Sequence, residues 1–141
     1  MTSIIPNATK KNLMNGGIDL DTDTIKVMLL TSTHANNADT QEFIDDVSAN
    51  EVSGTGYTAG GATLANKAVT QDNTDDEGVF DADDVSWAAS TITARYAVIY
   101  KDTGTPATSP IIAIIDFGED KVSSAGAFTI TWAAEGILNL N

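Results

Sequence analysis

Residues 93–101 (TARYAVIYK) restrict the possible folds of this chain more than any other segment. Their side chains alternate between two faces, with Tyr96, Val98 and Tyr100 on one and Ala97 and Ile99 on the other. Alternation with period two, rich in β-branched and aromatic residues, predicts a β-strand. We expect this strand to lie near the centre of a sheet.

The expected partner of this strand is the apolar run at 111–117 (IIAIIDF). The loop between the two runs contains Gly104, Pro106 and Pro110, and neither proline fits inside a hydrogen-bonded ladder. The two runs therefore predict a pair of neighbouring strands joined by this loop.

Further strands are expected at 24–31, 85–88 and 127–133, because each segment is short, apolar and rich in β-formers. Residues 24–31, 111–117 and 127–133 are expected to be central strands, as is 93–101. A hairpin is expected across the acidic turn at 72–78. Four glycines within 54–61 (GTGYTAGG) predict a loop with positive φ angles.

Together these segments predict a mainly β fold, namely a compact antiparallel β-sandwich or a partly open barrel. About seven or eight strands and one or two short helices are expected. The helices are expected at 6–15 and after Thr40, where Phe43, Ile44 and Val47 share one face. Strands do not alternate with helices as βαβ units require, so a parallel sheet is not expected.

The length of 141 residues predicts a single core. We expect an N-terminal arm or short helix at 1–15 and a single β domain at 16–141. No apolar run resembles a signal peptide or a membrane span, so synthesis in the cytoplasm is expected.

The charge and the cysteine count exclude several kinds of chemistry. Twenty Asp and Glu against seven Lys and Arg give a net charge of −13. Such a surface repels nucleic acid and anionic membranes and suits a basic partner. The chain has no cysteine, which excludes disulfides and thiolate sites. Phosphate-binding glycine motifs are missing as well, so no cofactor is expected.

Two acidic segments are candidate cation sites. Asp19, Asp21 and Asp23 have the spacing of the first three ligands of an EF-hand loop, but the glycine and the closing glutamate of that loop are missing. A polar turn before a strand is the preferred interpretation. Asp75 and Asp83 belong to an acidic run across the predicted hairpin, where a solvated tip is preferred over a metal site, with weak or no cation binding expected.

Catalytic residues are not expected. His34 is the sole histidine and is expected on a surface loop, without the positioned partners that a triad requires. Arg95 is the sole arginine and is expected to form a structural ion pair, which could lie at a subunit contact.

Aromatic side chains allow a carbohydrate-binding face as an alternative to a core. The residues concerned are Trp87, Tyr96, Tyr100 and Trp132. Because they alternate with aliphatic residues in predicted strands, we expect them in the core.

The N-terminal segment is the candidate partner-binding region. Its residues of interest are Ile4, Ile5, Lys10, Lys11, Leu13 and Met14. So short a segment is not a stable helix alone, so it packs either on its own domain or on a neighbouring subunit. The neighbour is favoured, and deletion of residues 1–15 is then expected to leave the melting nearly unchanged.

Several segments of the chain resemble small virion proteins encoded by tailed bacteriophages and prophages. They are 17–29 (GIDLDTDTIKVML), 43–46 (FIDD), 82–87 (ADDVSW), 97–104 (AVIYKDTG), 110–117 (PIIAIIDF) and 128–132 (FTITW). The resemblance covers roughly residues 10–140 and includes no catalytic motif.

This resemblance implies a non-enzymatic structural protein of the virion, a capsid decoration or cement protein that stabilises the head. The implied partners are the major capsid protein or other virion proteins, with a homo-oligomer expected. The alternative is a tail or fibre component that acts as a receptor-binding or glycan-binding adhesin.

Overall fold

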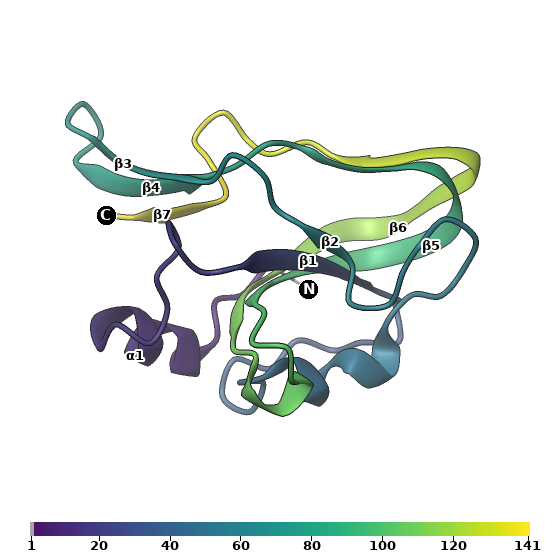
Figure 1. Cartoon of the computed structure of the whole chain (residues 1–141), viewed down its shortest axis with the longest axis horizontal. Helices are drawn as coiled ribbons and strands as arrows, with labels where there is room; N and C mark the ends of the chain where they lie inside the picture. The colour runs from purple at the N-terminus through teal and green to yellow at the C-terminus, as the bar shows by residue number, and fades with distance from the viewer. Residues whose placement is uncertain (1) are drawn as a thin grey trace.

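The structure is a computed structural model that describes residues 2–141. Within this range the chain forms two antiparallel sheets, in the strand orders β2-β1-β5-β6 and β3-β4-β7 (Figure 1). The strands are β1 (Ile25–Leu30), β2 (Ala62–Thr63), β3 (Ala68–Asp72), β4 (Glu77–Asp81), β5 (Val85–Lys101), β6 (Ile111–Ile130) and β7 (Leu138–Leu140). The mainly β fold is confirmed, and the sheets do not close into a barrel.

One α-helix and three 3-10 helices complete the described elements. They are α1 (Asn7–Met14), η1 (Ile44–Asp46), η2 (Ser48–Asn50) and η3 (Pro106–Thr108). The helix predicted at 6–15 and the hairpin predicted across 72–78 are confirmed, the latter as β3 paired with β4.

The longest feature is a ribbon of β5 and β6, which have 17 and 20 residues. The two strands pair from Val85 opposite Ile130 to Tyr100 opposite Ile111. Figure 1 shows this ribbon turning back on itself, so that its two halves lie in the two layers and run on into β4 and β7. A single folded ribbon therefore builds the frame of both layers.

The prediction of separate strands at 85–88 and 93–101 was wrong, because both belong to β5. The same holds for 111–117 and 127–133, which belong to β6. The register shifts at four places along the ribbon, one of them between Trp87 and Ser90. The shift between Trp87 and Ser90 places Ala88 and Ala89 together on the exposed side and breaks the alternation that marks a strand in the sequence.

A buried polar contact holds the bend in the ribbon. Ser90 is fully buried, and its Oγ lies 2.7 Å from the Oγ of Ser123 and 3.1 Å from the carbonyl oxygen of Gly126. The Ser123 hydroxyl also accepts the backbone N–H of Ile92 at 3.3 Å. These bonds satisfy polar groups that the interrupted ladder leaves unpaired.

The main core lies between the two layers. It joins the inner faces of the four-stranded sheet and of the three-stranded sheet, and its members include Val27, Leu29, Phe80, Trp87, Ala97, Ile99, Ile112, Phe128, Ile130 and Leu138. The segment 24–31 is the inner strand β1, and 93–101 is the inner half of the ribbon, as predicted. β6 is instead the edge strand of its sheet, so 111–117 and 127–133 are not central.

A second core covers the opposite face of the four-stranded sheet. Its members include Met28, Leu30, Ile44, Val47, Tyr96, Val98, Tyr100, Ile111 and Ile114. Both faces of β5 between residues 96 and 100 are therefore buried, which agrees with the central strand expected at 93–101.

In place of the short helix expected after Thr40, the chain forms two 3-10 turns, η1 and η2. Backbone hydrogen bonds join Ile44 N–H to the Ser109 carbonyl and Ile111 N–H to the Glu42 carbonyl, at 3.0 and 2.9 Å. These long-range bonds hold the backbone at Phe43 in an extended conformation, so that only the short η1 and η2 turns follow. The predicted apolar face is nevertheless buried in the second core through Ile44 and Val47.

Trp132 was expected inside the core but lies beyond the end of β6 and is half-buried. Its backbone N–H donates to Asp84 Oδ1 at 3.0 Å, and its indole Nε1–H donates to the Asp83 carbonyl at 2.9 Å. These bonds replace strand pairing where the ribbon passes into β4 and β7.

The glycine-rich loop at 54–61 packs its backbone directly against the four-stranded sheet. Gly61 has φ +77°, and a Cβ at this position would lie 1.7 Å from the carbonyl oxygen of Val27. Gly56 has φ +79°, and a Cβ there would lie 2.2 Å from the Ala89 carbonyl oxygen. The glycines thus provide both the positive φ that the sequence predicted and the close approach of two backbones.

Gly61→Ala should destabilise the protein much more than Gly104→Ala. Gly104 has a similar φ of +84° but nothing within 4 Å of an added Cβ, so it isolates the backbone strain. We expect about 1–2 kcal/mol for Gly104→Ala and more than about 3 kcal/mol for Gly61→Ala, measured by chemical denaturation. Equal losses would contradict the backbone contact.

Candidate functional site

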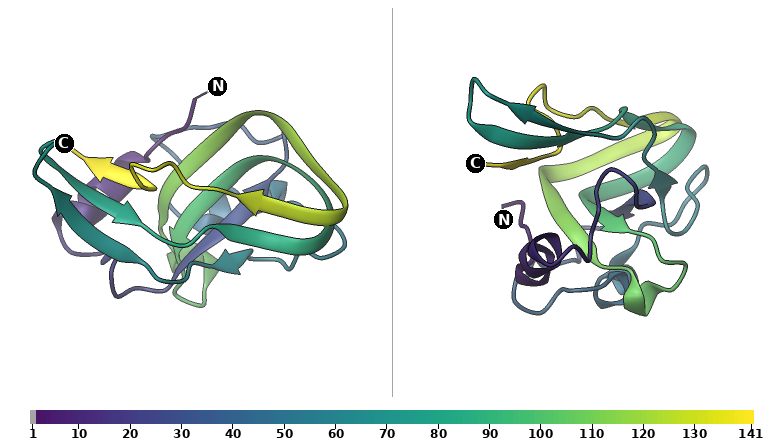
Figure 2. Two further views of the ribbon diagram at one scale, coloured as in Figure 1. Left: turned by 90° about the horizontal axis from the view of Figure 1, so that it is seen from above. Right: turned by 60° about the vertical axis from the view of Figure 1, so that its left-hand side comes forward.

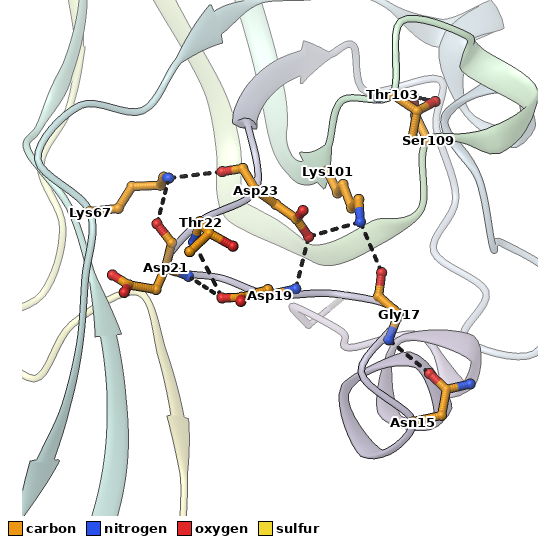
Figure 3. Close-up of polar contacts among 10 residues, drawn as sticks. All are labelled: Asn15, Gly17, Asp19, Asp21, Thr22, Asp23, Lys67, Lys101, Thr103 and Ser109. Carbon is orange, nitrogen blue, oxygen red and sulfur yellow. Dashed lines mark hydrogen bonds and ion pairs between the residues drawn. The ribbon is translucent and has the colours of Figure 1, made fainter.

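The first candidate cation site, at residues 19–23, is a turn closed by its own carboxylates (Figure 3). Asp19 Oδ1 accepts the backbone N–H groups of Asp21 and Thr22 at 3.1 and 3.2 Å. Asp23 Oδ2 accepts the backbone N–H of Asp19 at 2.8 Å. Hydrogen bonds from Thr22 lower the pKa of Asp19. The preferred interpretation, a polar turn before a strand, is confirmed.

Two lysines neutralise this turn. Lys101 Nζ lies 2.9 Å from Asp23 Oδ2 and donates to the Gly17 carbonyl at 3.1 Å. Lys67 Nζ donates to the carbonyl groups of Asp21 and Asp23 at 3.1 and 2.8 Å. Figure 3 shows the Lys101 ammonium directed at the Asp23 carboxylate and the Lys67 ammonium directed at two backbone carbonyl oxygens. These contacts join the turn to the end of β5 and to the residue that precedes β3.

The other candidates, Asp75 and Asp83, lie at opposite ends of β4. Asp75 is exposed in the β3–β4 turn, where Asp72 Oδ1 accepts its backbone N–H at 3.3 Å. Asp83 follows β4 and accepts a hydrogen bond from Asn66 at 2.6 Å. The two carboxylates cannot share one ion. Among residues 2–141, no group of three or more His, Asp or Glu side chains is placed to hold a metal.

His34 was expected on the surface, but it is buried, with 3% of its surface exposed. Its ring packs edge-on against Tyr96 at 5.0 Å between ring centroids, and its Nε2 lies 3.0 Å from Asn36 Oδ1. Burial lowers the pKa of His34. This residue closes one end of the second core.

Arg95 forms the ion pair that the sequence predicted. Its Nε donates to Asp116 Oδ1 at 2.7 Å across the β5–β6 ribbon, and its guanidinium lies 5.9 Å from the centre of the Tyr96 ring. Asp116 Oδ1 also accepts the Gly118 N–H at 2.8 Å. The hydrogen bond from Arg95 lowers the pKa of Asp116, whose side chain is only 1% exposed.

The aromatic residues do not form a carbohydrate-binding face. Trp87, Tyr96 and Tyr100 are 7%, 2% and 3% exposed, which confirms their expected place in the core. Trp132 is the half-buried member of the set. An exposed platform of stacked rings is therefore not formed by these four residues.

The N-terminal segment packs on its own domain, whereas the sequence favoured packing on a neighbouring subunit. Ile4 forms a bridge with Ile114, with backbone hydrogen bonds of 2.8 and 2.9 Å. The fully buried Thr9 donates its hydroxyl proton to the Ile111 carbonyl at 2.5 Å. Ile4, Ile5 and Leu13 pack against the two cores, whereas Met14, Lys10 and Lys11 are exposed. The N-terminal segment therefore forms its hydrogen bonds with β6 of the same chain.

Sequence reasoning missed a pocket of about 390 Å³ between the glycine loop and the loop at 102–109. Glu51 Oε1 accepts the Tyr57 hydroxyl at 2.8 Å and the Gly60 N–H at 2.6 Å, and Tyr100 donates to the Gly60 carbonyl at 2.7 Å. Burial raises the pKa of both tyrosines, which keeps their hydroxyls protonated as donors. Glu51, Tyr57 and Tyr100 thus hold the glycine loop in place through hydrogen bonds. Their spacing in the sequence gives no sign that they lie together.

The sequence also gave no sign that β3 is an open edge. Residues 68–71 are exposed, and β3 pairs only with β4 within the described chain. Beside it lies a hollow of about 490 Å³ whose lining includes the carboxylates of Asp72, Asp75, Glu77, Asp81 and Glu135. This edge is the least covered backbone of the fold.

Comparison of the chain with protein-family models, with curated proteins and with solved structures finds no match. None of the helices within residues 2–141 is long and apolar enough to cross a membrane. The geometry described above is thus the basis for an assignment of function, together with the resemblance found in the sequence.

The pH dependence of stability should reveal the Arg95–Asp116 pair. Because the pKa of Asp116 is lowered in the folded state, its contribution is present above its unfolded pKa of about 3.9 and disappears as the pH falls through the folded value. Arg95→Met should therefore reduce the free energy of unfolding more at pH 7 than at pH 3. Lys121→Met, which removes an exposed ion pair with Glu119, is the control with a much smaller effect.

Deletion of residues 1–15 should now lower the melting temperature markedly. The deletion uncovers apolar side chains of both cores and leaves the Ile111 carbonyl without its donor, a loss of about 2–5 kcal/mol. Met14→Ala removes an 89% exposed side chain and should leave melting unchanged. Unchanged melting of the deletion variant would restore the hypothesis of an arm ordered by a neighbour.

Proposed function

We propose that this chain is a non-enzymatic structural protein of a bacteriophage virion, a capsid decoration or cement protein that stabilises the head. The resemblance of its strand and turn segments to small virion proteins supports this assignment. Its partners would be the major capsid protein or other virion proteins, and the chain itself would form a homo-oligomer. It would be made in the host cytoplasm and function in the virion.

The observation that carries this proposal is the use made of the polar side chains. Asp23 and Lys101 join a turn to the sheet, Arg95 and Asp116 join the two strands of the ribbon, and Glu51 fastens the glycine loop. Groups suited to catalysis or metal binding are thus engaged in holding loops and strands together. Such use is typical of a protein whose task is mechanical.

The surface also suits an external position on a particle. A net charge of −13 keeps many neighbouring copies soluble and repels the packaged nucleic acid, which favours the outside of the shell. A decoration protein adds buried interface between capsid subunits, and repeated contacts raise its avidity. The adhesin alternative depended on an aromatic face, and the burial of Trp87, Tyr96 and Tyr100 weighs against it.

The copy number of the chain in purified particles tests the proposal. A head decoration protein should be present on the order of hundreds of copies, because it follows the capsid lattice. Quantitative mass spectrometry against the major capsid protein measures this ratio. Particles that lack the chain should release their DNA at a lower temperature.

Two results would contradict the proposal. A copy number of about ten or a few tens, with an elongated trimer in gel filtration, would place the chain in the tail or a fibre. Complete absence of the chain from particles would remove it from the virion.

A further inference from the structure

The backbone of β3 offers an unpaired strand edge. β3 has five residues, and all five pair with β4 in continuous register from Ala68 opposite Asp81 to Asp72 opposite Glu77. Its other side has no neighbouring strand within the described chain. Unpaired N–H and C=O groups along such an edge are a template for a further strand.

The other edges of the two sheets are short or protected. β2 and β7 have two and three residues. β6 is bridged by Ile4 and is interrupted at Gly118 and Ala125, which have φ angles of +82° and +50°. β3 contains no proline, lysine or bulge, which are the usual protections of an exposed edge. It is thus the edge that the fold leaves available.

The inner side of this edge is apolar and uncovered. Val69 lies opposite the buried Phe80, so it points to the core side of the sheet, yet it is 51% exposed. In the next row, a Cβ on Gly78 would meet nothing within 4 Å, and its partner Leu140 is 59% exposed. Figure 2 shows the β3–β4 hairpin reaching the end of the molecule beside the C-terminus.

The outer side of this edge is acidic. Asp72 and Glu77 form one cross-strand pair, and Asp81 lies on the same face four residues from Glu77. These carboxylates line the hollow of about 490 Å³, and its lining includes no lysine or arginine. Asp81 Oδ1 is buried without a hydrogen-bond partner among residues 2–141. Asp75 and Glu135 of the same lining are exposed, so an incoming ammonium or guanidinium group would pair with them.

We propose that β3 is the docking edge for an extended basic segment of a partner protein, which adds to the three-stranded sheet as a fourth strand. Apolar side chains of the segment would pack beside Val69, and alternate Lys or Arg side chains would face the acidic hollow. A second copy of this chain would bring its own excess of acid to the same hollow, so charge favours a different partner. The inference rests on the proposed function because it names a contact that a structural component needs.

A blocked peptide of about nine residues that alternates Lys and Val is the probe, added to the full chain. We expect amide NMR shifts concentrated at residues 68–72 and an affinity that falls with added salt. Val69→Asp should weaken binding at least about tenfold, because it places a charge on the apolar side. Val122→Asp is the matched control, since Val122 is 68% exposed but lies on β6. Near-ultraviolet circular dichroism checks that both variants fold.

A second peptide separates strand pairing from charge alone. It keeps the lysines but has proline in place of valine, so it cannot pair as a strand. Equal binding of the two peptides, equal effects of the two variants, or no binding at millimolar peptide would overturn the proposal. A dimer of the free chain that Val69→Asp dissociates would assign the edge to a second copy instead. These outcomes concern the isolated protein and are independent of the copy number in particles.

Discussion

The bend in the β5–β6 ribbon is the constraint on which the rest of the structure depends. A straight ribbon of this length exposes both of its faces, whereas the folded ribbon brings its two halves together around one core. The contact between Ser90 and Ser123 satisfies the polar groups at the bend, where an unpaired buried group would cost about 1–3 kcal/mol. This bend produces the two layers, the one main core and the path into β4 and β7.

Burial on both sides of the four-stranded sheet explains why the polar residues are where they are. With Tyr96–Tyr100 buried on both faces, many charged groups lie in loops, at strand ends and in the hairpin turn, and Arg95 and Asp116 pair with each other across the ribbon. Repulsion among these negative charges is reduced by cationic side chains that contact turns and strands, such as Lys101 and Arg95. The twenty acids leave a surplus, and that surplus determines which partners the surface accepts.

The sequence predicted the features that depend on local pattern and missed those that depend on distant contacts. The alternation at 93–101 predicted a strand near the centre of a sheet, and the three aspartates at 19–23 predicted a turn. The continuity of β5 was hidden, because the bulge places Ala88 and Ala89 together on the exposed side. The extended backbone at Phe43 depends on residues 109–111, and the burial of His34 depends on Tyr96. In the pocket beside the glycine loop, Glu51 and Tyr100 lie close together only because of the fold, so the sequence could not predict their contact with Gly60.

The same bend determines where the molecule can accept a partner. Because β4 and β7 continue the ribbon and pair with each other, β3 is the single strand added to them in the three-stranded sheet. The first layer gains β1 and β2, and its β6 edge is covered in part by Ile4. The open edge is therefore β3, which leads into the acidic turn at 72–78. At this edge, unpaired backbone groups lie beside negatively charged side chains. Backbone groups on any edge would pair with any strand, so selectivity between a copy and a partner must come from this charge.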